Sequence, residues 1–397
     1  MTLSLDLQQL MRKHYPRLAK SHGLSGDMHR AAWAIMHCRT RELGGHVNSC
    51  PHGHFHQVAY NSCSHRCCPK CGWLPREKWL DGWRNRLLPV PHHHLIFTIP
   101  HSLNPLWRYN KRAFADVLFQ AASQTLMQLL GSQDYLGARP GILAALHTWN
   151  QKLDVHVHLH VLVSAGGLTE DGTWVAAKKK CLLPRKVVMT KFRGKFKALL
   201  REMVVAGKIQ LPPGWTRNQF YALLYKLSDP WNVKVFDAYA GGVSVVTYLA
   251  RYLRGGPIGN SRLLEERDGQ VVFRYRLSEL EGGDGKRQAV TRLPTDTFLL
   301  RWLEHVPPRR YQCVRGFGLY SGNQHSGLVQ AHQTLGGCYD PGSEEPKTWQ
   351  EVCDAAGMEQ ACRCPECGTL LVSHHSFHPG RSPPSSAFVT RTLGQIA

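Results

Sequence analysis

The sequence lacks any long apolar run. Its 397 residues contain no stretch of about 18 consecutive apolar residues, the length that a membrane-spanning helix requires. The first 20 residues also lack the continuous apolar segment of a secretory signal, and their pattern predicts an amphipathic helix. These absences argue against a membrane partner, and we expect a cytoplasmic protein.

Acidic residues are scarce relative to basic ones. Asp and Glu number 28 against 49 Lys and Arg, and the formal net charge is +21. An excess of this size favours a polyanionic partner, because each phosphate contact releases counterions. The alternative is a solvated basic surface like that of many soluble proteins. Hydrophobic residues make up 43% of the chain, which indicates a globular protein of two or three domains.

Cysteines are plentiful and cluster at the two ends of the chain. Without an export signal, the 13 cysteines favour metal binding over disulfides. In the stretch 38–71, Cys68 and Cys71 form a Cys-x-x-Cys knuckle, which supplies two of the four tetrahedral ligands of zinc. The stretch has enough ligands for two zinc ions; the alternative is a few buried thiols beside surface histidines. The candidate ligands are Cys38, His46, Cys50, His52, His54, His56, Cys63, His65, Cys67, Cys68 and Cys71.

The second cysteine cluster, "CRCPECG", supplies half of a zinc site. Cys364 and Cys367 bracket Pro-Glu before Gly368, a pattern typical of a zinc-ribbon turn. Neither cluster contains a glutamate suited to activating a zinc-bound water, so both are interpreted as structural, with DNA contact as their purpose. The candidate partners for the second cluster are Cys353, Cys362, His374, His375 and His378.

Three regions of the chain differ in residue composition and in predicted secondary structure, and we expect one domain for each. Residues 1–90 combine two helical patterns, the second beginning near Ser25 as N-cap, with the zinc-binding stretch. Residues 91–305 form a core of strands and helices, including a long helical pattern at 110–130. Residues 306–397 contain an aromatic and basic stretch, the second cysteine cluster and a Pro- and Ser-rich tail that we expect to be poorly ordered.

The segment "DVHVHLHV" at 154–161 predicts a strand with one imidazole face. His156, His158 and His160 share that face, while Val155, Val157, Leu159 and Val161 share the other and should pack on the core. Residues two apart on a strand lie ~7 Å apart, so two histidines can converge on one cation but three cannot. The alternative is an exposed strand whose histidines face solvent.

A third metal ligand is expected from the preceding strand. If residues 150–154 connect "GILAALHTW" to the histidine strand as a hairpin, His147 lies opposite His158. His147 is therefore a candidate ligand that depends on the register, and His156 remains the other candidate.

Two tyrosines share a face of a predicted helix at 241–254. Tyr248 and Tyr252 are separated by four residues beside an apolar stripe, and Arg251 and Arg254 flank them. By themselves they are two ordinary half-buried tyrosines. Beside a metal-binding histidine strand they suggest nucleophiles, since a cation can polarise a scissile phosphate for attack by a phenol. Such a reaction leaves a 5′-phosphotyrosine and a free 3′-hydroxyl, and a second hydroxyl can later reseal the DNA.

The sequence resembles a known family. His-Leu-His at 158–160 matches the His-hydrophobic-His (HUH) motif of single-strand endonucleases, and Tyr248 with Tyr252 matches their two-tyrosine motif. More specifically, the chain is similar to rolling-circle transposases of the insertion-sequence ninety-one branch. The similar blocks include "CRTRELGGHV", "CCPKC", "FTIPHSLNPLW", "HVHLHVLVSAGGL", "YLARYLRGGPIGNSRLL" and "RWLEHVPPRRYQCVRGFGLYSGN".

The resemblance implies an α+β fold, with a zinc-binding N-terminal domain and an HUH catalytic domain built on a central antiparallel sheet with packed helices. It implies that His158 and His160 bind Mg²⁺ or Mn²⁺ and that Tyr248 and Tyr252 are the nucleophiles. The implied function is cleavage and rejoining of single-stranded DNA at the ends of a mobile element and at its target, in a bacterial, nucleoid-associated protein. No small-molecule substrate is expected.

Two positions depart from the family pattern. The family usually has Cys-x-x-Cys after the "GGHV" block, but here Gly53 stands where the second cysteine would fall, and His52 or His54 could replace it. Cys67 stands where the family commonly has a histidine. Both changes leave nitrogen or sulfur ligands for zinc.

Basic segments elsewhere fit a protein that handles DNA. Lys178, Lys179 and Lys180 form one run, and Lys191 and Arg193 belong to another that also contains Phe192 and Phe196. The charges could follow phosphates while the rings stack on bases; a solvated helix face is an equally good interpretation of each. Two functional alternatives remain. One is a replication initiator or relaxase with the same chemistry, and the other is a non-catalytic, zinc-dependent DNA-binding regulator.

Overall fold

The computed structural model describes residues 5–177, 182–227, 231–239, 242–253, 255–277, 287–340 and 347–380. The chain forms two units, each assembled from separate stretches of sequence. Unit 1 comprises Met1–Trp79, Arg254–Val306 and Glu345–Ala397, and unit 2 comprises Leu80–Leu253 and Pro307–Glu344. This division differs from the three regions 1–90, 91–305 and 306–397 of the sequence analysis. Unit 1 combines N-terminal residues with C-terminal residues. No helix in the described ranges is long and apolar enough to cross a membrane.

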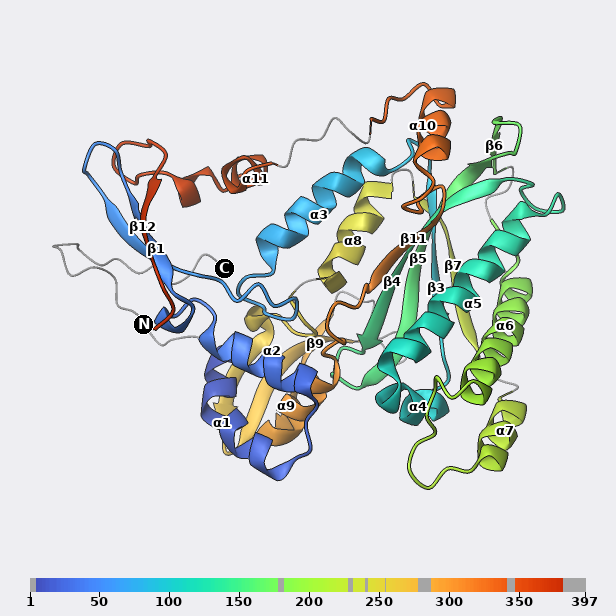
Figure 1. Ribbon diagram of the computed structural model, residues 1–397, viewed down its shortest axis with the longest axis horizontal. Helices are drawn as coiled ribbons and strands as arrows, with labels where there is room; N and C mark the ends of the chain where they lie inside the picture. Colours follow the sequence, from blue (N-terminus) through green and yellow to red (C-terminus); the bar gives the residue numbers. More distant parts are fainter. Residues whose placement is uncertain are drawn as a thin grey trace. The chain divides into compact units, whose positions relative to one another are not determined.

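Unit 2 is built on an antiparallel sheet with the strand order β11–β4–β5–β3–β7, and a short strand, β6, pairs with β5 (Figure 1). The strands are β3 (His92–Thr98), β4 (Arg139–Trp149), β5 (Val155–Leu168), β6 (Trp174–Ala176), β7 (Asn232–Tyr239) and β11 (Val314–Gly318). The α+β class and the central antiparallel sheet expected from the sequence are confirmed.

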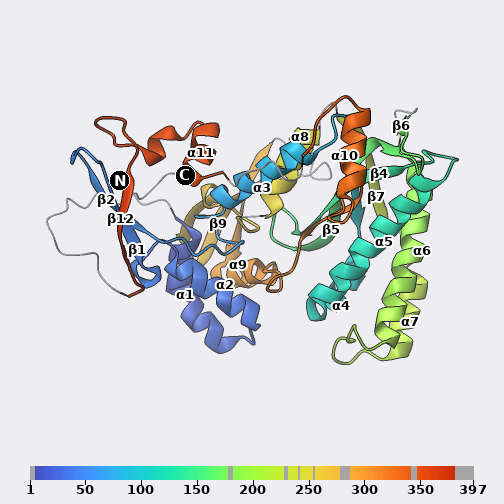
Figure 2. The same cartoon turned by 45° about the horizontal axis from the view of Figure 1, so that its top comes forward.

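Helices α5 (Lys111–Gly131) and α6 (Arg185–Val205) lie side by side over one face of this sheet (Figure 2). Val157, Leu159 and Val161 of β5 are buried in the hydrophobic core that forms there. The aliphatic face of the histidine strand therefore packs on the core, as predicted. The other helices of this unit include α4 (Asn104–Tyr109), α7 (Arg217–Lys226) and α10 (His325–Thr334).

Phe192 and Phe196 of α6 are fully buried in the same core. The suggestion that their rings stack on DNA bases is therefore wrong. They belong to a series of apolar residues with i, i+4 spacing along α6, which also includes Val188 and Leu200. Lys191 of the same helix is exposed.

Helix α8 (Gly242–Leu253) covers the opposite face of the sheet and packs against β4 and β5. A Cβ atom at Gly242 would lie 2.8 Å from Nδ1 of His92, so the start of the helix touches the face of β3 that carries His92 and His94. Val246, Leu249 and Ala250 of α8 are buried. The helix predicted at 241–254 is confirmed.

Unit 1 contains a sheet of β8 (Leu263–Arg267), β9 (Gln270–Arg276) and β10 (Gln288–Pro294), together with helices α1 (Leu7–Ser21), α2 (Gly26–His37) and α9 (Thr295–Glu304). The side chain of Ser25 caps α2 by accepting a hydrogen bond from the Met28 amide, as expected. Helix α3 (Trp73–Arg86) contains the point at which the chain passes into unit 2.

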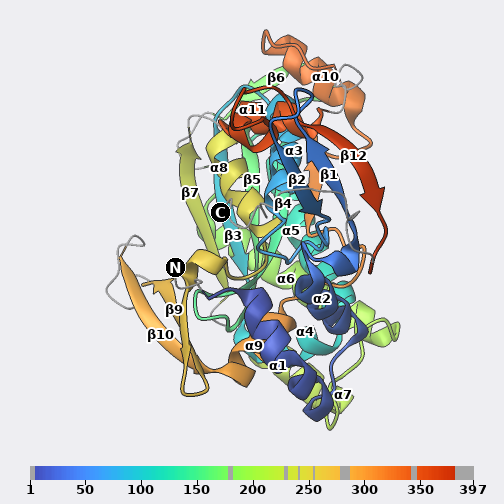
Figure 3. The ribbon, with the colours of Figure 1, turned by 90° about the vertical axis from the view of Figure 1, so that its left-hand side faces the viewer.

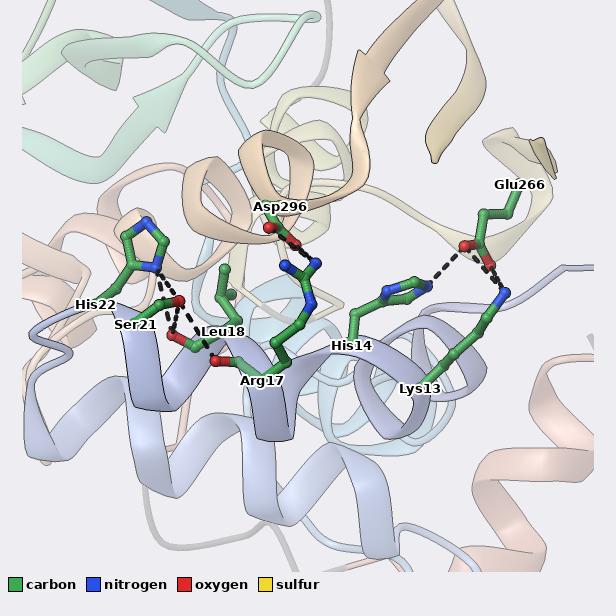
Figure 4. Close-up of polar contacts among 8 residues, drawn as sticks. All are labelled: Lys13, His14, Arg17, Leu18, Ser21, His22, Glu266 and Asp296. Atoms are coloured by element: carbon green, nitrogen blue, oxygen red, sulfur yellow. Dashed lines mark hydrogen bonds and ion pairs between the residues drawn. The ribbon is translucent and has the colours of Figure 1, made fainter. Parts of the chain in front are cut away.

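Charged residues of α1 bind this sheet and α9 (Figure 4). Nζ of Lys13 lies 3.0 Å from one carboxylate oxygen of Glu266, and Nε2 of His14 lies 2.6 Å from the other. Arg17 pairs with Asp296 at 2.7 Å. Within α1, Ser21 donates a hydrogen bond to the carbonyl of Leu18. These ion pairs hold α1 against segments more than 250 residues away in sequence.

A second sheet of unit 1 joins the two ends of the chain. Strands β1 (Gly45–Ser49) and β2 (His56–Tyr60) form a hairpin, and β12 (Val372–Phe377) pairs antiparallel with β1 (Figure 3). The strand order is β12–β1–β2. Helix α11 (Trp349–Ala355) precedes β12. The two cysteine clusters are therefore parts of one unit.

Candidate active site and metal centres

The histidine strand and its neighbour converge on one point. His147 of β4 is the register partner of His158 of β5, as the hairpin predicted. Nδ1 of His147 lies 2.9 Å from Nε2 of His158, and that nitrogen lies 3.1 Å from Nε2 of His160. All three side chains are buried. The structure thus brings together one ring nitrogen from each of three histidines.

The hydrogen bonding of His158 fixes its tautomer. Nδ1 of His158 lies 2.7 Å from the carbonyl oxygen of His156, which can only accept, so Nδ1 carries the hydrogen. Nε2 of His158 therefore presents a lone pair towards the other two rings. Burial also lowers the pKa of His158 to about 3 and that of His160 well below its usual value. Both imidazoles are neutral near pH 7, the form that binds a metal.

The donor spacing fits a divalent cation. An octahedral ion with metal–ligand distances of ~2.1 Å places neighbouring donor atoms ~3.0 Å apart, and the two nitrogen separations here are 2.9 and 3.1 Å. Imidazole nitrogen suits transition metals better than Mg²⁺, which prefers oxygen. The three-histidine group therefore fits Mn²⁺ better than Mg²⁺.

His94 of β3 was not among the residues predicted from the sequence, although it touches this group. Its Nε2 lies 3.0 Å from Nδ1 of His160, and the two rings are stacked. A hydrogen bond of this kind orients a ligating imidazole. The alternation of His92 and His94 in "HHHLIF" is the sequence signal that places His94 on the same side of the sheet as the histidine strand.

His156 lies outside the three-histidine group. Its Nδ1 is 3.1 Å from Nε2 of His101, which belongs to a short 3₁₀ turn (His101–Leu103) after β3. Of the two residues proposed as a third ligand, the structure places His147, and not His156, with His158 and His160.

The two tyrosines lie one turn apart on α8, the helix that packs on β4 and β5. The side chains of Tyr248, Tyr252 and Arg251 lie outside the described part of the structure. Arg254, Lys178, Lys179 and Lys180 also fall outside the described residues. The helix that carries the tyrosines thus contacts the two strands that carry His147, His158 and His160.

A third tyrosine near this site has a structural role. Nδ1 of His92 donates to the carbonyl of Val90, so Nε2 accepts a hydrogen bond of 2.6 Å from the hydroxyl of Tyr320. The same hydroxyl accepts from the amide of Leu88 at 3.1 Å. Burial raises the pKa of Tyr320 above its usual value. A phenol held in this way is a poor nucleophile, and Tyr320 therefore serves packing.

Four thiols of unit 1 form a second candidate metal centre. Cys38, Cys63, Cys68 and Cys71 bring their sulfurs within 4.8 Å of one another. The sulfurs of Cys63 and Cys71 are 3.6 Å apart, and tetrahedral zinc with Zn–S bonds of ~2.3 Å requires ~3.8 Å. Hydrogen bonds from Cys63 and Cys68 lower the pKa of Cys38, as expected where several thiols surround one thiolate.

A third group combines the two cysteine clusters. Its members are Cys50, His54, Cys364 and Cys367. The sequence predicts partners for the second cluster among Cys353, Cys362, His374, His375 and His378. The structure instead pairs it with the β1–β2 hairpin. His46, His52 and Cys67 belong to none of the three groups, and the side chains of His374 and His375 lie outside the described part of the structure.

The surface of α6 and α7 offers a basic and aromatic patch. Lys197, Arg201, Tyr221, Leu224 and Tyr225 line an open pocket there. The guanidinium carbon of Arg201 lies 6.0 Å from the centre of the Tyr221 ring, and the side chain of Tyr225 is 88% exposed. In place of the buried phenylalanines, α7 supplies one exposed ring, Tyr225, and one half-buried ring, Tyr221, beside the basic side of α6.

Two family models match the sequence. The model described as "Putative transposase" matches residues 141–327, and the model described as "Transposase zinc-binding domain" matches residues 10–99. The first range contains all of β4 except its first two residues, together with β5 and α8, and these elements carry the three-histidine group and the two tyrosines. The second contains the four-thiol group.

Two curated proteins are similar over most of their length. The chain is 35% identical over 373 residues to "Putative transposase y4qJ" of Sinorhizobium fredii, which covers 91% of this chain and 92% of that protein. It is 30% identical over 355 residues to "Transposase for insertion sequence element IS801" of Pseudomonas savastanoi pv. phaseolicola. This alignment covers 85% of this chain and 80% of that protein.

Proposed function

The chain belongs to the insertion-sequence ninety-one branch of transposases, and we propose that it cleaves and rejoins single-stranded DNA at the ends of a mobile element through a 5′-phosphotyrosine intermediate. The observation that carries this proposal is the packing of α8, which bears Tyr248 and Tyr252, against the strands that bear the three-histidine group. A nucleophile and a cation site on adjoining elements are the two parts that metal-assisted attack on a phosphate needs.

The proposed reaction exchanges one phosphoester bond for another. The phenol oxygen of Tyr248 or Tyr252 attacks phosphorus as it loses its proton. The bond to the 3′ oxygen then breaks, and that oxygen takes up a proton to become a 3′-hydroxyl. The tyrosine keeps the 5′ phosphate, so a later 3′-hydroxyl reverses the step without ATP. A second tyrosine allows one DNA end to remain covalently attached to the protein while the other tyrosine cuts another DNA end.

The protein's histidines contribute orientation and charge. A bound Mn²⁺ or Mg²⁺ would supply Lewis-acid polarisation of the scissile phosphate. His158 and His160 would hold that ion with His147 as the third ligand, and His94 would orient His160. Because burial keeps the imidazoles of His158 and His160 neutral, protons do not compete with the ion at these two ligands near pH 7.

We assign the zinc-binding domain a structural role in the same protein. Cys38, Cys63, Cys68 and Cys71 would bind one Zn²⁺ as four thiolates, a closed ligand set that leaves no position for a reacting water. All four belong to unit 1, whereas the three-histidine group belongs to unit 2. Zinc is therefore assigned to folding and the second cation to catalysis.

The pocket on α6 and α7 is the proposed contact for single-stranded DNA in unit 2. Arg201 and Lys197 provide positive charge, and Tyr225 provides an exposed ring on which a base can stack. Stacking on an aromatic ring is available to an unpaired base, since a duplex buries its base faces. This pocket therefore favours single strands over duplex DNA.

The decisive experiment labels single-stranded oligonucleotides of the element's ends at either the 5′ or the 3′ terminus. With Mn²⁺ we expect a protein adduct on the 5′ side of the downstream fragment and a free 3′-hydroxyl on the other fragment. Either single variant, Tyr248→Phe or Tyr252→Phe, should retain some adduct, and the double variant should form none. Tyr109→Phe is the matched control, because it removes an exposed phenol of α4 outside the pocket on α6 and α7 and should leave the adduct unchanged.

The alternatives give different results in the same experiment. A non-catalytic regulator would bind DNA and form no adduct with any cation. A replication initiator or relaxase would form the adduct at a plasmid origin and not at the element's ends. Cleavage by the double variant would overturn the assignment of the nucleophiles.

A further inference from the structure

We propose a second zinc site in unit 1, which fastens the C-terminal segment to the N-terminal hairpin and whose four ligands are Cys50, His54, Cys364 and Cys367. The matched zinc-binding domain spans residues 10–99, so half of this site lies outside it. The proposal concerns the architecture of unit 1 and does not depend on the tyrosine chemistry.

The distances within the group fit zinc. The sulfurs of Cys50 and Cys367 are 3.5 Å apart, and Nδ1 of His54 lies 3.9 Å from the sulfur of Cys50. A tetrahedral zinc ion separates sulfur ligands by ~3.8 Å and sulfur from nitrogen by ~3.5 Å. All four ligand atoms lie within 4.8 Å of one another. Three thiols with one imidazole are a usual structural zinc set.

The backbone forms a turn on each side of the group. In "CPHGH" the amide of Gly53 donates to the carbonyl of Cys50 at 2.9 Å, and in "CPECG" the amide of Gly368 donates to the carbonyl of Cys364 at 2.9 Å. Both glycines have positive φ angles, 77° and 70°, a conformation that glycine adopts without strain. Each turn thus begins with Cys-Pro and folds back on its first cysteine.

The first turn differs from the second in the position of its other ligand. Gly53 occupies the place that corresponds to Cys367, and the next residue, His54, supplies the ligand atom. An imidazole reaches further from its backbone than a thiol, so a ligand one residue later still reaches the group. His52 is exposed and is not part of it. The geometry therefore decides between His52 and His54, which the sequence left open.

The packing around the group is too small to hold the segments by itself. Cys50, Cys364 and Leu371 form a buried cluster with Phe55 packed against it. A core of this size provides little hydrophobic stabilisation, and small domains of this kind depend on a metal. The pairing of β12 with β1 begins directly after this cluster, between Val372 and Ser49. A zinc ion would fix the register at that end of the sheet.

Metal content is the direct test. Full-length protein, purified without chelators, should contain two zinc ions per chain by inductively coupled plasma mass spectrometry. His54→Ala and Cys367→Ser should each lower the content to one. Both side chains are exposed, so their loss disturbs little packing. His52→Ala is the matched control two residues away and should keep two.

A second measurement reports on the C-terminal segment. In the two ligand variants, limited proteolysis should cleave the chain within residues 347–380 sooner than in the wild-type protein or in His52→Ala. Cobalt substitution should give the absorption of thiolate-bound Co²⁺ for two sites in the wild type and for one in His54→Ala. Neither measurement uses DNA, so their outcome is separate from that of the cleavage assay.

Three results would overturn the proposal. One is a wild-type content of a single zinc ion that neither ligand variant changes. Another is a disulfide between Cys50 and Cys367 in the purified protein, seen by mass spectrometry after alkylation. The third is zinc content that falls equally in His52→Ala and His54→Ala.

Discussion

His147 lies directly across the β4–β5 hairpin from His158, with Nδ1 of one ring 2.9 Å from Nε2 of the other. This relationship turns a pair of alternate histidines on one strand into a three-nitrogen site. It also ties the site to the register of a hairpin, because a shift of one residue would move His147 to the other face of the sheet.

Replacing His147 with alanine should weaken metal binding. We expect the Mn²⁺ concentration for half-maximal cleavage to rise by at least ~10-fold, because one nitrogen ligand is lost. Mn²⁺ should also support cleavage at lower concentrations than Mg²⁺ in the wild type, given three imidazole donors. The measurement is the cleavage rate as a function of metal concentration. His156→Ala is the control, and an equal shift in that variant would count against the assignment of His147.

Removing His94 should affect the affinity for the metal more than the maximal rate. His94 contacts Nδ1 of His160 and does not belong to the ligand group. We expect His94→Ala to weaken Mn²⁺ binding ~10–100-fold, with the rate largely restored at saturating Mn²⁺. His94→Gln, which keeps a polar partner for His160, should be less affected. A low rate at saturating Mn²⁺ in a fully folded His94→Ala protein would contradict a positioning role.

Removing the ring of Tyr225 should weaken binding to single-stranded DNA. Loss of one base–aromatic stack corresponds to ~1–3 kcal/mol, which fluorescence anisotropy with a labelled oligonucleotide would detect. Arg201→Ala should instead lower the dependence of affinity on salt, since a phosphate contact is lost. Tyr109→Ala is the control, because Tyr109 is also exposed but lies outside the pocket. Equal losses of DNA affinity in Tyr109→Ala and Tyr225→Ala would show that Tyr225 is not a specific stacking site for a base.

The ion pairs of Glu266 should make the stability of unit 1 depend on pH. Burial raises the pKa of Glu266, but the hydrogen bonds and charges of Lys13 and His14 outweigh it, so the net shift is downward. A carboxyl with a lowered pKa stabilises the folded state above its unfolded pKa of ~4.3, and this contribution is lost as the pH falls through the folded value.

Glu266→Gln should therefore lower the free energy of unfolding by about 0.5–1 kcal/mol at pH 7. The difference from the wild type should shrink below pH ~4, where the wild-type carboxyl becomes protonated. Thermal unfolding between pH 3 and pH 7 measures this difference, and a constant difference at all pH values would show that packing, and not charge, is responsible.

Local patterns predicted the β4–β5 hairpin and helix α8 of unit 2, whereas the central antiparallel sheet was expected from the family resemblance. The alternation of His158 and Leu159 across β5 identified both faces of the strand, and the short connection to β4 gave the pairing of His147. A register shift between His147 and Trp149 could not be foreseen, because a bulge depends on the packing of the whole hairpin. Base stacking was predicted for Phe192 and Phe196 from their basic neighbours, but their repeat with Val188 and Leu200 along α6 indicates that they face the core.

The composite metal group could not be completed from the sequence. Cys364 and Cys367 show by their spacing that they form half of a site, but spacing does not identify a partner some 300 residues away. That information lies in the pairing of β12 with β1, a long-range contact without a local signal. The choice between His52 and His54 likewise required the conformation of the turn at Gly53.

The joining of the two chain ends in one sheet has a consequence for synthesis on the ribosome. His54, the later of the two hairpin ligands, is made 310 residues before Cys364, the difference between positions 364 and 54. At ~5–20 residues per second, the hairpin waits roughly 15–60 s for its partner strand. Truncated translation products that end before Cys364 never complete the sheet. Only a chain translated past Phe377 can close this part of the protein.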